Sequence, residues 1–418
     1  MKFSFGVLYI LLFLSVTLSS CSNIKFVKTD GIDFKIKGTT YNYIGCNYWY
    51  GGYIGFSDKA RLIAELDFLN RQNIRNLRVF ICGEGDSSYP FRISPSLQES
   101  PKQYNEDILK GFDYFLAEAS KRNMKIVFVL NNNWEWSGGF GQYLEWSGKA
   151  NPPLPKTKLW DWRNYSNYIA QFYSCDSCLA WNNAWIQKVV NRKNTITDKL
   201  YKEDECIMAW ELANEPRPMD SAAIEPYKKW VHETSALIKS IDKNHLVTIG
   251  TEGVISTFYS GNIYSSIHEN KNIDYCTLHL WPKTWAWYNG KNEHALSDTS
   301  LNKTKKYIEQ HAQITKKLNK PIVIEEFGLH RDGNSFHPTS TVANRNKYYD
   351  FVFKTGKANG ISGYNFWGFA GIPENYNPKG FMQKGMSYSA DPPQEEQGLY
   401  SVFMGDSSTW KIIQSNIK

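Results

Sequence analysis

Two glutamates, each at the end of a predicted buried strand, are the residues of this chain best placed to do chemistry. Glu215 lies at the end of a predicted buried strand that begins with the apolar run at 206–209, and it precedes Pro216, which cannot donate to a sheet ladder and therefore ends the strand. Glu326 follows the run at 321–324 and precedes Phe327-Gly328. Carboxylates at the carboxyl ends of buried parallel strands lie where α/β proteins keep their active sites. A pair of such carboxylates points to cleavage of a glycosidic bond.

Each motif also has a structural interpretation. Glu215 could cap the next helix or pair with Arg217, and one short motif cannot decide between these roles and catalysis. Two further carboxylates complicate the choice. Alternation along a strand predicts that Glu325 faces away from Glu326 and serves as a buried structural partner. Glu211 shares the face of Glu215 but lies deeper, and we expect it to pair with a cation such as Arg78.

The sequence resembles clan A retaining glycoside hydrolases, and most closely the endo-β-1,4-mannanase branch of family 5. The motifs that carry the resemblance occur in order through nearly the whole chain: Tyr48-Trp49, Leu77-Arg78-Val79-Phe80, Asn132-Asn133-Trp134, Trp210 to Arg217, His279-Leu280-Trp281-Pro282, Glu325 to Gly328, Asn365-Phe366-Trp367 and Asp391-Pro392-Pro393. The resemblance implies Glu215 as the acid/base and Glu326 as the nucleophile of a retaining mechanism.

The same resemblance implies a substrate-binding set. Asn214 would bind the sugar 2-hydroxyl, and Trp367 would be the stacking platform beneath the sugar in the −1 subsite, whose glycosidic bond is cleaved. The other implied members orient the carboxylates or form neighbouring subsites: Arg78, His279, Trp134 and Trp49. One position departs from the family, which commonly has a tyrosine two residues after this histidine; here it is Trp281, whose indole can donate but not accept a hydrogen bond. Either Trp281 replaces that contact in part or another group supplies it.

Apolar runs and amphipathic segments alternate along the chain, which predicts an α/β fold of the (β/α)₈ TIM-barrel class. A hairpin at 25–40 is expected to plug the barrel floor. The eight predicted strands are 43–47, 75–80, 125–130, 207–214, 246–250, 275–280, 322–325 and 363–366. About 75 residues separate the third strand from the fourth, and we expect this enlarged connection, with its seven tryptophans, to form a wall of the cleft.

Residues 1–20 have the pattern of a secretory signal peptide, so we expect a secreted, extracellular protein with one catalytic domain at 21–418. Cys21 follows small residues, and in a bacterial host it could carry lipid and anchor the protein to a membrane. Secretion suits a small disulfide between Cys175 and Cys178. The sequons at Asn164 and Asn302 are glycosylation candidates in a eukaryotic host.

Composition excludes several other classes. The formal charge of +7 comes from scattered lysines and arginines, which argues against nucleic-acid binding, whereas 15 tryptophans suit a polysaccharide cleft. No histidine pair has a metal-ligand spacing, so we expect neither a metal nor another cofactor, and we expect a monomer. The favoured function is endo-hydrolysis of β-1,4-mannan, glucomannan or galactomannan. The alternatives are another β-glycanase, such as an endoglucanase, and a catalytically silent polysaccharide-binding barrel.

Overall fold

The computed structural model describes residues 26–417 apart from 87–88, 90, 155–160, 289–295, 374–381 and 383–384. The predicted leader at 1–20, Cys21 and Trp160 of the predicted cleft wall lie outside the described residues. Within the described part, no helix has the length and apolar character needed to cross a membrane.

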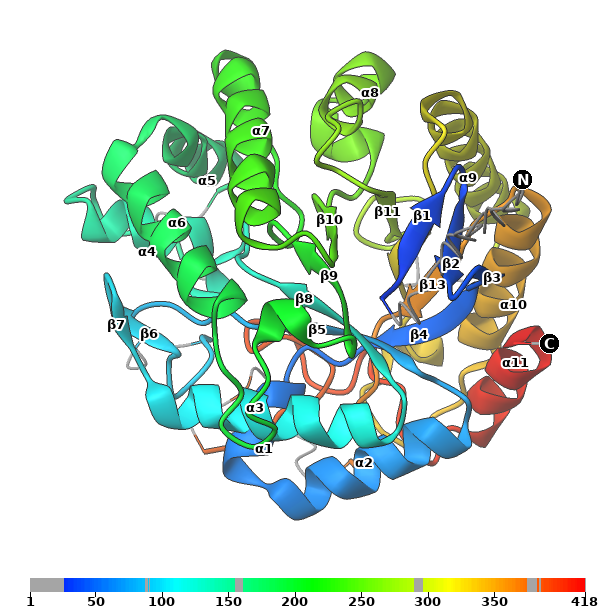
Figure 1. Cartoon of the computed structure of the whole chain (residues 1–418). Helices are drawn as coiled ribbons and strands as arrows, with labels where there is room; N and C mark the ends of the chain where they lie inside the picture. Colours follow the sequence, from blue (N-terminus) through cyan, green and yellow to red (C-terminus); the bar gives the residue numbers. More distant parts are fainter. Residues whose placement is uncertain are drawn as a thin grey trace, which may run out of the picture.

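Eight parallel strands form the centre of the molecule, with helices around them (Figure 1). Their residues are almost all buried, as expected for strands that pack against side chains inside the barrel and helices outside it. The strands are β4 (Tyr43–Asn47), β5 (Asn76–Phe80), β8 (Lys125–Val129), β9 (Ile207–Glu211), β10 (Leu246–Thr248), β11 (Cys276–Leu280), β12 (Ile322–Phe327) and β13 (Gly363–Phe366).

Ladders join these strands in the order β10-β9-β8-β5-β4-β13-β12-β11. The remaining seam, between β10 and β11, is bridged by single hydrogen bonds, including Asp274 N–H to the Val247 carbonyl (2.8 Å) and His279 N–H to the Glu252 carbonyl (3.1 Å). The predicted (β/α)₈ barrel is therefore confirmed, and its strands match the predicted ranges to within a few residues.

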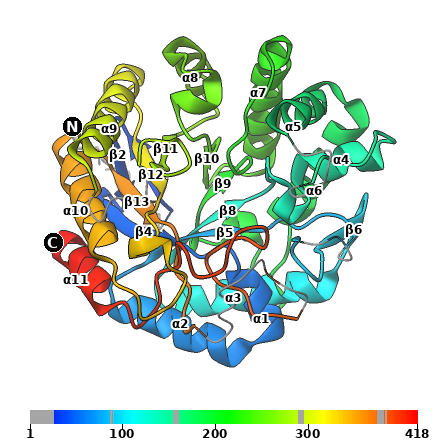
Figure 2. The same ribbon diagram turned by 180° about the vertical axis from the view of Figure 1, so that it is seen from behind.

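The helices lie on the outside of the strands in both views (Figure 2). They are α1 (Gly51–Ser57), α2 (Lys59–Arg71), α3 (Glu106–Lys121), α4 (Gly139–Trp146), α5 (Trp162–Ile169), α6 (Asp176–Val190), α7 (Ile224–Ile241), α8 (Gly261–His268), α9 (Asp298–Leu318), α10 (Ala343–Ala358) and α11 (Ser407–Ile417). Side-chain caps fix several of their first turns. Asn105, for example, accepts backbone N–H bonds from Asp107 and Ile108 at the start of α3.

A small antiparallel sheet precedes the barrel, built from β1 (Lys28–Asp30), β2 (Asp33–Ile36) and β3 (Thr39–Thr40). Its buried Phe34 packs in one cluster with Tyr43, Leu246 and Tyr275, which lie at or beside the amino ends of barrel strands. The predicted plug of the barrel floor is confirmed, with a third short strand added to the hairpin.

The long connection between β8 and β9 contains α4, α5 and α6, and a disulfide joins Cys175 to Cys178 at the start of α6. Only part of its predicted tryptophan wall faces the cleft. Trp134, Trp136 and Trp162 line the cavity described below, whereas the others in the described chain pack against the core: Trp146, Trp181 and Trp185. A short two-stranded sheet, β6 (Gln98–Ser100) with β7 (Gln103–Tyr104), lies in the β5–α3 connection.

Candidate active site

Glu215 lies in the turn after β9 and not at the strand tip that the sequence predicts. The strand ends at Glu211, but the chain stays beside its neighbour, because Glu215 N–H donates to the Gly250 carbonyl at 2.9 Å. Glu215 has a φ of +50°, in the left-handed region that non-glycine residues rarely occupy. This turn holds the carboxylate over the carboxyl end of the barrel.

A bulge in β12 determines the position of the second carboxylate. Pairing with β11 shifts register between Leu278 and His279, and pairing with β13 shifts between Ile324 and Phe327. Two residues of β12 therefore oppose one residue of its neighbour. As a result Glu325, like Glu326, lies near Arg78 and His279, at 3.8 and 3.6 Å, and the prediction that it faces away was wrong.

Arg78, from β5, connects the buried carboxylates beneath the site. Its Nη1 donates to Glu326 Oε1 at 2.5 Å, and its Nε and Nη2 form a two-point contact with Glu211 at 2.9 and 2.5 Å. Nη2 also donates to Asn214 Oδ1 at 2.8 Å, and Nε lies 3.8 Å from Glu325. The predicted pairing of Glu211 with Arg78 is confirmed. Arg78 also holds the carboxylate of Glu326, in the position that the resemblance implies.

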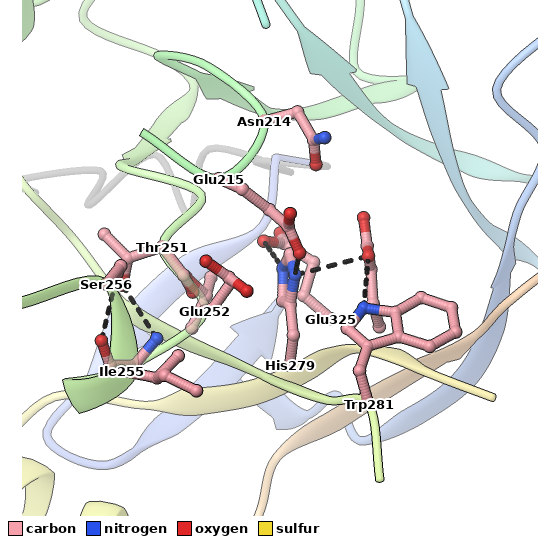
Figure 3. A network of polar contacts seen from close by, with 12 residues as sticks. Asn214, Glu215, Thr251, Glu252, Ile255, Ser256, His279, Trp281 and Glu325 are labelled. Atoms are coloured by element: carbon pink, nitrogen blue, oxygen red, sulfur yellow. Dashed lines mark hydrogen bonds and ion pairs between the residues drawn. The ribbon is translucent and has the colours of Figure 1, made fainter. Parts of the chain in front are cut away.

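His279, from β11, lies among three carboxylates. Its Nδ1 is 2.7 Å from Glu215 Oε1 and 3.3 Å from Glu326 Oε2, and its Nε2 is 3.6 Å from Glu325. Figure 3 shows the imidazole directly beside the Glu215 carboxylate. The imidazole therefore fixes the position of one carboxylate relative to the other.

The charges of this cluster are coupled. Burial opposes charge on His279, but Glu326 and the hydrogen bonds to the three glutamates raise its pKa well above the ordinary histidine value. Burial likewise opposes ionisation of Glu326, but the charges of His279 and Arg78 lower its pKa below the usual value. Burial raises the pKa of Glu211 to about 8, with the nearby Glu325 carboxylate adding to the shift.

Two indole N–H groups complete the contacts of Glu215 and Glu326. Trp281 donates to Glu326 Oε2 at 3.1 Å, and Trp134 donates to Glu215 Oε2 at 2.6 Å. No tyrosine hydrogen bond to Glu326 occurs among the residues that the structure describes. The indole of Trp281 therefore supplies the donor at this position.

A cavity of about 990 Å³ opens above both glutamates. Trp367, 4% exposed, lines it together with Asn214, Trp134 and Trp281. Trp49 does not reach the cavity and was wrongly predicted as a subsite residue. Its side chain is 0% exposed, donates to the Ala390 carbonyl at 3.0 Å and packs edge-on against Trp136 and Tyr388. The segment after β13 covers it.

The geometry agrees with comparisons to known proteins. The family described as GH family 5 beta-mannosidase-like matches residues 24–418. The chain belongs to glycoside hydrolase family 5. It is accordingly a glycoside hydrolase, as the two glutamates at the carboxyl end of the barrel lead one to expect.

Curated plant relatives cover most of the chain. Mannan endo-1,4-beta-mannosidase 4 of Solanum lycopersicum is 30% identical over 347 residues, which span 80% of this chain and 79% of the relative. Mannan endo-1,4-beta-mannosidase 1 of Arabidopsis thaliana is 30% identical over 365 residues, or 82% of this chain and 81% of the relative.

Solved structures give the same family. A family 5 mannosidase from Rhizomucor miehei matches with a TM-score of 0.86 and 32% identity over 94% of this chain and 97% of that one. An endo-1,4-beta-mannanase from the same organism matches with a TM-score of 0.71 and 25% identity over 94% of this chain and 98% of that one.

Two further ionisable groups line the cavity and were not predicted from the sequence. Glu252 forms a two-point ion pair with Arg217 at 2.5 and 2.7 Å, so Arg217 does not serve as the ion-pair partner of Glu215. Glu252 follows β10 by four residues, and the strand-end rule that found Glu215 could have found it. Burial and the carboxylates of Asp391 and Glu326 raise the pKa of Glu395 to about 8. No motif in the sequence marks Glu395.

Potential metal-ligand atoms of Glu215, His279 and Glu326 lie within 4.8 Å of one another. The raised pKa of His279 favours the protonated imidazole, which has no lone pair to offer a metal. Of the other predictions, the Cys175–Cys178 bond is present, and Asn164 and Asn302 are exposed on α5 and α9.

Proposed function

We propose that this protein hydrolyses β-1,4-mannosidic bonds in mannan-type polysaccharides with retention of anomeric configuration. One observation carries the mechanism: a carboxylate oxygen of Glu215 and one of Glu326 lie within 4.8 Å of each other. Retaining glycosidases have their carboxyl groups about 5–5.5 Å apart, whereas inverting enzymes leave room for a water molecule between more distant groups.

The two glutamates have different roles in this proposal. Glu326, kept ionised by Arg78 and His279, attacks the anomeric carbon as the bond to the leaving oxygen breaks, and Glu215 gives that oxygen a proton. The product is a covalent mannosyl ester of Glu326. Glu215 then takes a proton from water, whose oxygen attacks the anomeric carbon and releases Glu326.

The substrate class rests on the relatives, whose names specify mannan and mannose-containing glycans. Side-by-side assays on mannan, glucomannan, galactomannan and cellulose test it directly. Proton NMR of the first product tests the mechanism, since retention gives the β-anomer first. An initial α-anomer would contradict the mechanism, and reducing ends released only from cellulose would contradict the substrate.

A second mode, removal of single mannosyl units from a chain end, competes with the endo mode. The higher TM-score to the mannosidase (0.86) than to the endo-mannanase (0.71) favours it. The products of mannohexaose distinguish the modes. Mannose alone at early times indicates chain-end cleavage, and a mixture of shorter oligosaccharides indicates internal cleavage.

We further propose that the protein is secreted through its leader at 1–20 and acts as a monomer. Gel filtration and N-terminal sequencing of the protein recovered from culture medium test both statements.

A further inference from the structure

Two adjacent aromatic side chains at the turn between β10 and α8 extend into the mouth of the active-site cavity. Phe258 is 48% exposed and Tyr259 is 68% exposed, and both line the cavity that contains Glu215 and Glu326. Neither ring makes a stacking contact, a side-chain hydrogen bond or an ion pair in the described part of the chain. About half of the Phe258 surface and about two thirds of the Tyr259 surface are therefore free to contact a ligand.

The backbone at this turn is unfavourable for these two residues. Phe258 has a φ of +55° and Tyr259 a φ of +60°, so two successive residues with large side chains occupy the left-handed region. Glycine would adopt this conformation without steric conflict. A strained backbone that presents exposed rings is therefore not explained by the stability of the fold.

The turn is nevertheless rigidly anchored. Tyr307 of α9 accepts a hydrogen bond from Ile255 N–H at 3.2 Å and donates to the Glu252 carbonyl at 2.8 Å. His311 of α9 accepts from Val254 N–H at 2.8 Å. Thr257 donates from its hydroxyl to the Ser260 carbonyl at 3.0 Å, and Tyr259 N–H donates to the Val254 carbonyl at 2.7 Å. The backbone that carries the two rings is thus held in place at the cavity mouth.

The turn belongs to the Glu215 side of the cavity. Glu252, a few residues before it, pairs with Arg217, and Arg217 lies over the rings of Trp134 and Trp162 at 5.2 and 5.5 Å. Trp134 in turn donates to Glu215. In the proposed mechanism Glu215 protonates the leaving oxygen, so the departing part of the sugar chain extends along this side.

We infer that Phe258 and Tyr259 form a binding subsite for the leaving-group part of a β-linked polysaccharide, beyond the sugar next to the cleaved bond. The ligand is a pyranose ring of the substrate chain, whose apolar C–H face packs on an exposed aromatic ring. This inference rests on the proposed function. It adds that kcat/KM rises with the length of the substrate chain on the leaving-group side, because an anchored backbone presents the aromatic surface at a reduced cost in ordering.

The test is the double variant Phe258→Gly with Tyr259→Gly, assayed on mannohexaose and on an aryl β-mannoside too short to reach the turn. We expect the ratio of kcat/KM for the long substrate to that for the short one to fall about tenfold, since an aromatic platform of this kind contributes that order of binding. We also expect the unfolding temperature to stay equal or rise, because glycine relieves the left-handed conformation. Tyr259→Phe keeps the ring and should retain most of the wild-type ratio.

Phe56→Ala is the matched control, because Phe56 is exposed (42%) and does not line the cavity. An unchanged ratio in the double glycine variant would overturn the inference, whatever its unfolding temperature. Failure of the proposed function gives a different result, namely a wild-type protein that cleaves neither mannohexaose nor the aryl β-mannoside.

Discussion

The cavity has two unlike halves, one built around Glu326 and the other around Glu215. The Glu326 half is enclosed, with Arg78 and His279 buried beneath the carboxylate and Trp281, Trp367 and Tyr400 above it. The Glu215 half is more open, and its outer residues include Trp162, which is 53% exposed. The difference suits the proposed roles, because a nucleophile needs fixed charges shielded from water, whereas the leaving group must be able to diffuse away.

The two halves should respond differently when their carboxylates are removed. Glu326→Ala should lower turnover by about 10⁴-fold or more on every substrate, because no other group attacks the anomeric carbon. Added azide should restore reaction and give the α-mannosyl azide, since the anion attacks from the face that Glu326 occupied. Circular dichroism provides the control for folding. Near wild-type activity in this variant would contradict the role of Glu326, and Glu325→Ala would then be the variant to measure.

The loss of activity in Glu215→Ala should depend on the leaving group of the substrate. On mannan, kcat should fall about 10²- to 10⁴-fold, the usual contribution of general acid–base catalysis. A dinitrophenyl mannoside needs no protonation, so formation of the covalent intermediate should be affected far less, and azide should give the β-mannosyl azide. Equal losses on both substrates would mean that Glu215 does not protonate the leaving oxygen.

The charge beneath the enclosed half predicts a pH effect. His279 and Arg78 lower the pKa of Glu326, and Glu326 must be ionised to attack. His279→Gln removes one of these charges, so the pKa of Glu326 should rise and the acid limb of kcat/KM should move to higher pH. Activity should fall more at pH 5 than at pH 7. Trp281→Phe is the control, because it removes a neutral donor to the same carboxylate and should move the limb less. A limb that moves to lower pH in the His279 variant would contradict the assignment.

Trp367 lines the cavity and Trp49 lies in the core, so replacing each tryptophan should affect a different property. Trp367→Ala should cost about 1–3 kcal/mol of transition-state binding, or about 5- to 150-fold in kcat/KM. Trp49→Ala should cost about 3–5 kcal/mol of folding free energy, because its ring is fully buried, with little change in activity per folded molecule. Denaturant unfolding and kinetics on the same preparations separate the effects. A stability loss without a kinetic loss in Trp367→Ala would show that it is a core residue.

Much of the site could be predicted from local sequence. Pro216 and Gly328 mark where two strands end, so the chain itself indicates that Glu215 and Glu326 lie at one end of the barrel. The pairing of Arg78 with Glu211 could also be inferred, because inward-facing residues of nearby strands meet inside a barrel.

The alternation of apolar runs and amphipathic helices was sufficient to predict the barrel. Strands that are apolar on both faces must be buried on both faces, and a barrel surrounded by helices provides that burial. The tertiary structure determined which side chains face the site and which are buried. The β12 bulge arises from register with β11 and β13, so strand periodicity alone placed Glu325 on the wrong face. Trp49 is buried because residues near 390 cover it, more than 300 positions away in the chain. The exposure of Phe258 and Tyr259 likewise depends on a turn anchored by α9, and burial fixed by distant segments cannot be read from the residues themselves.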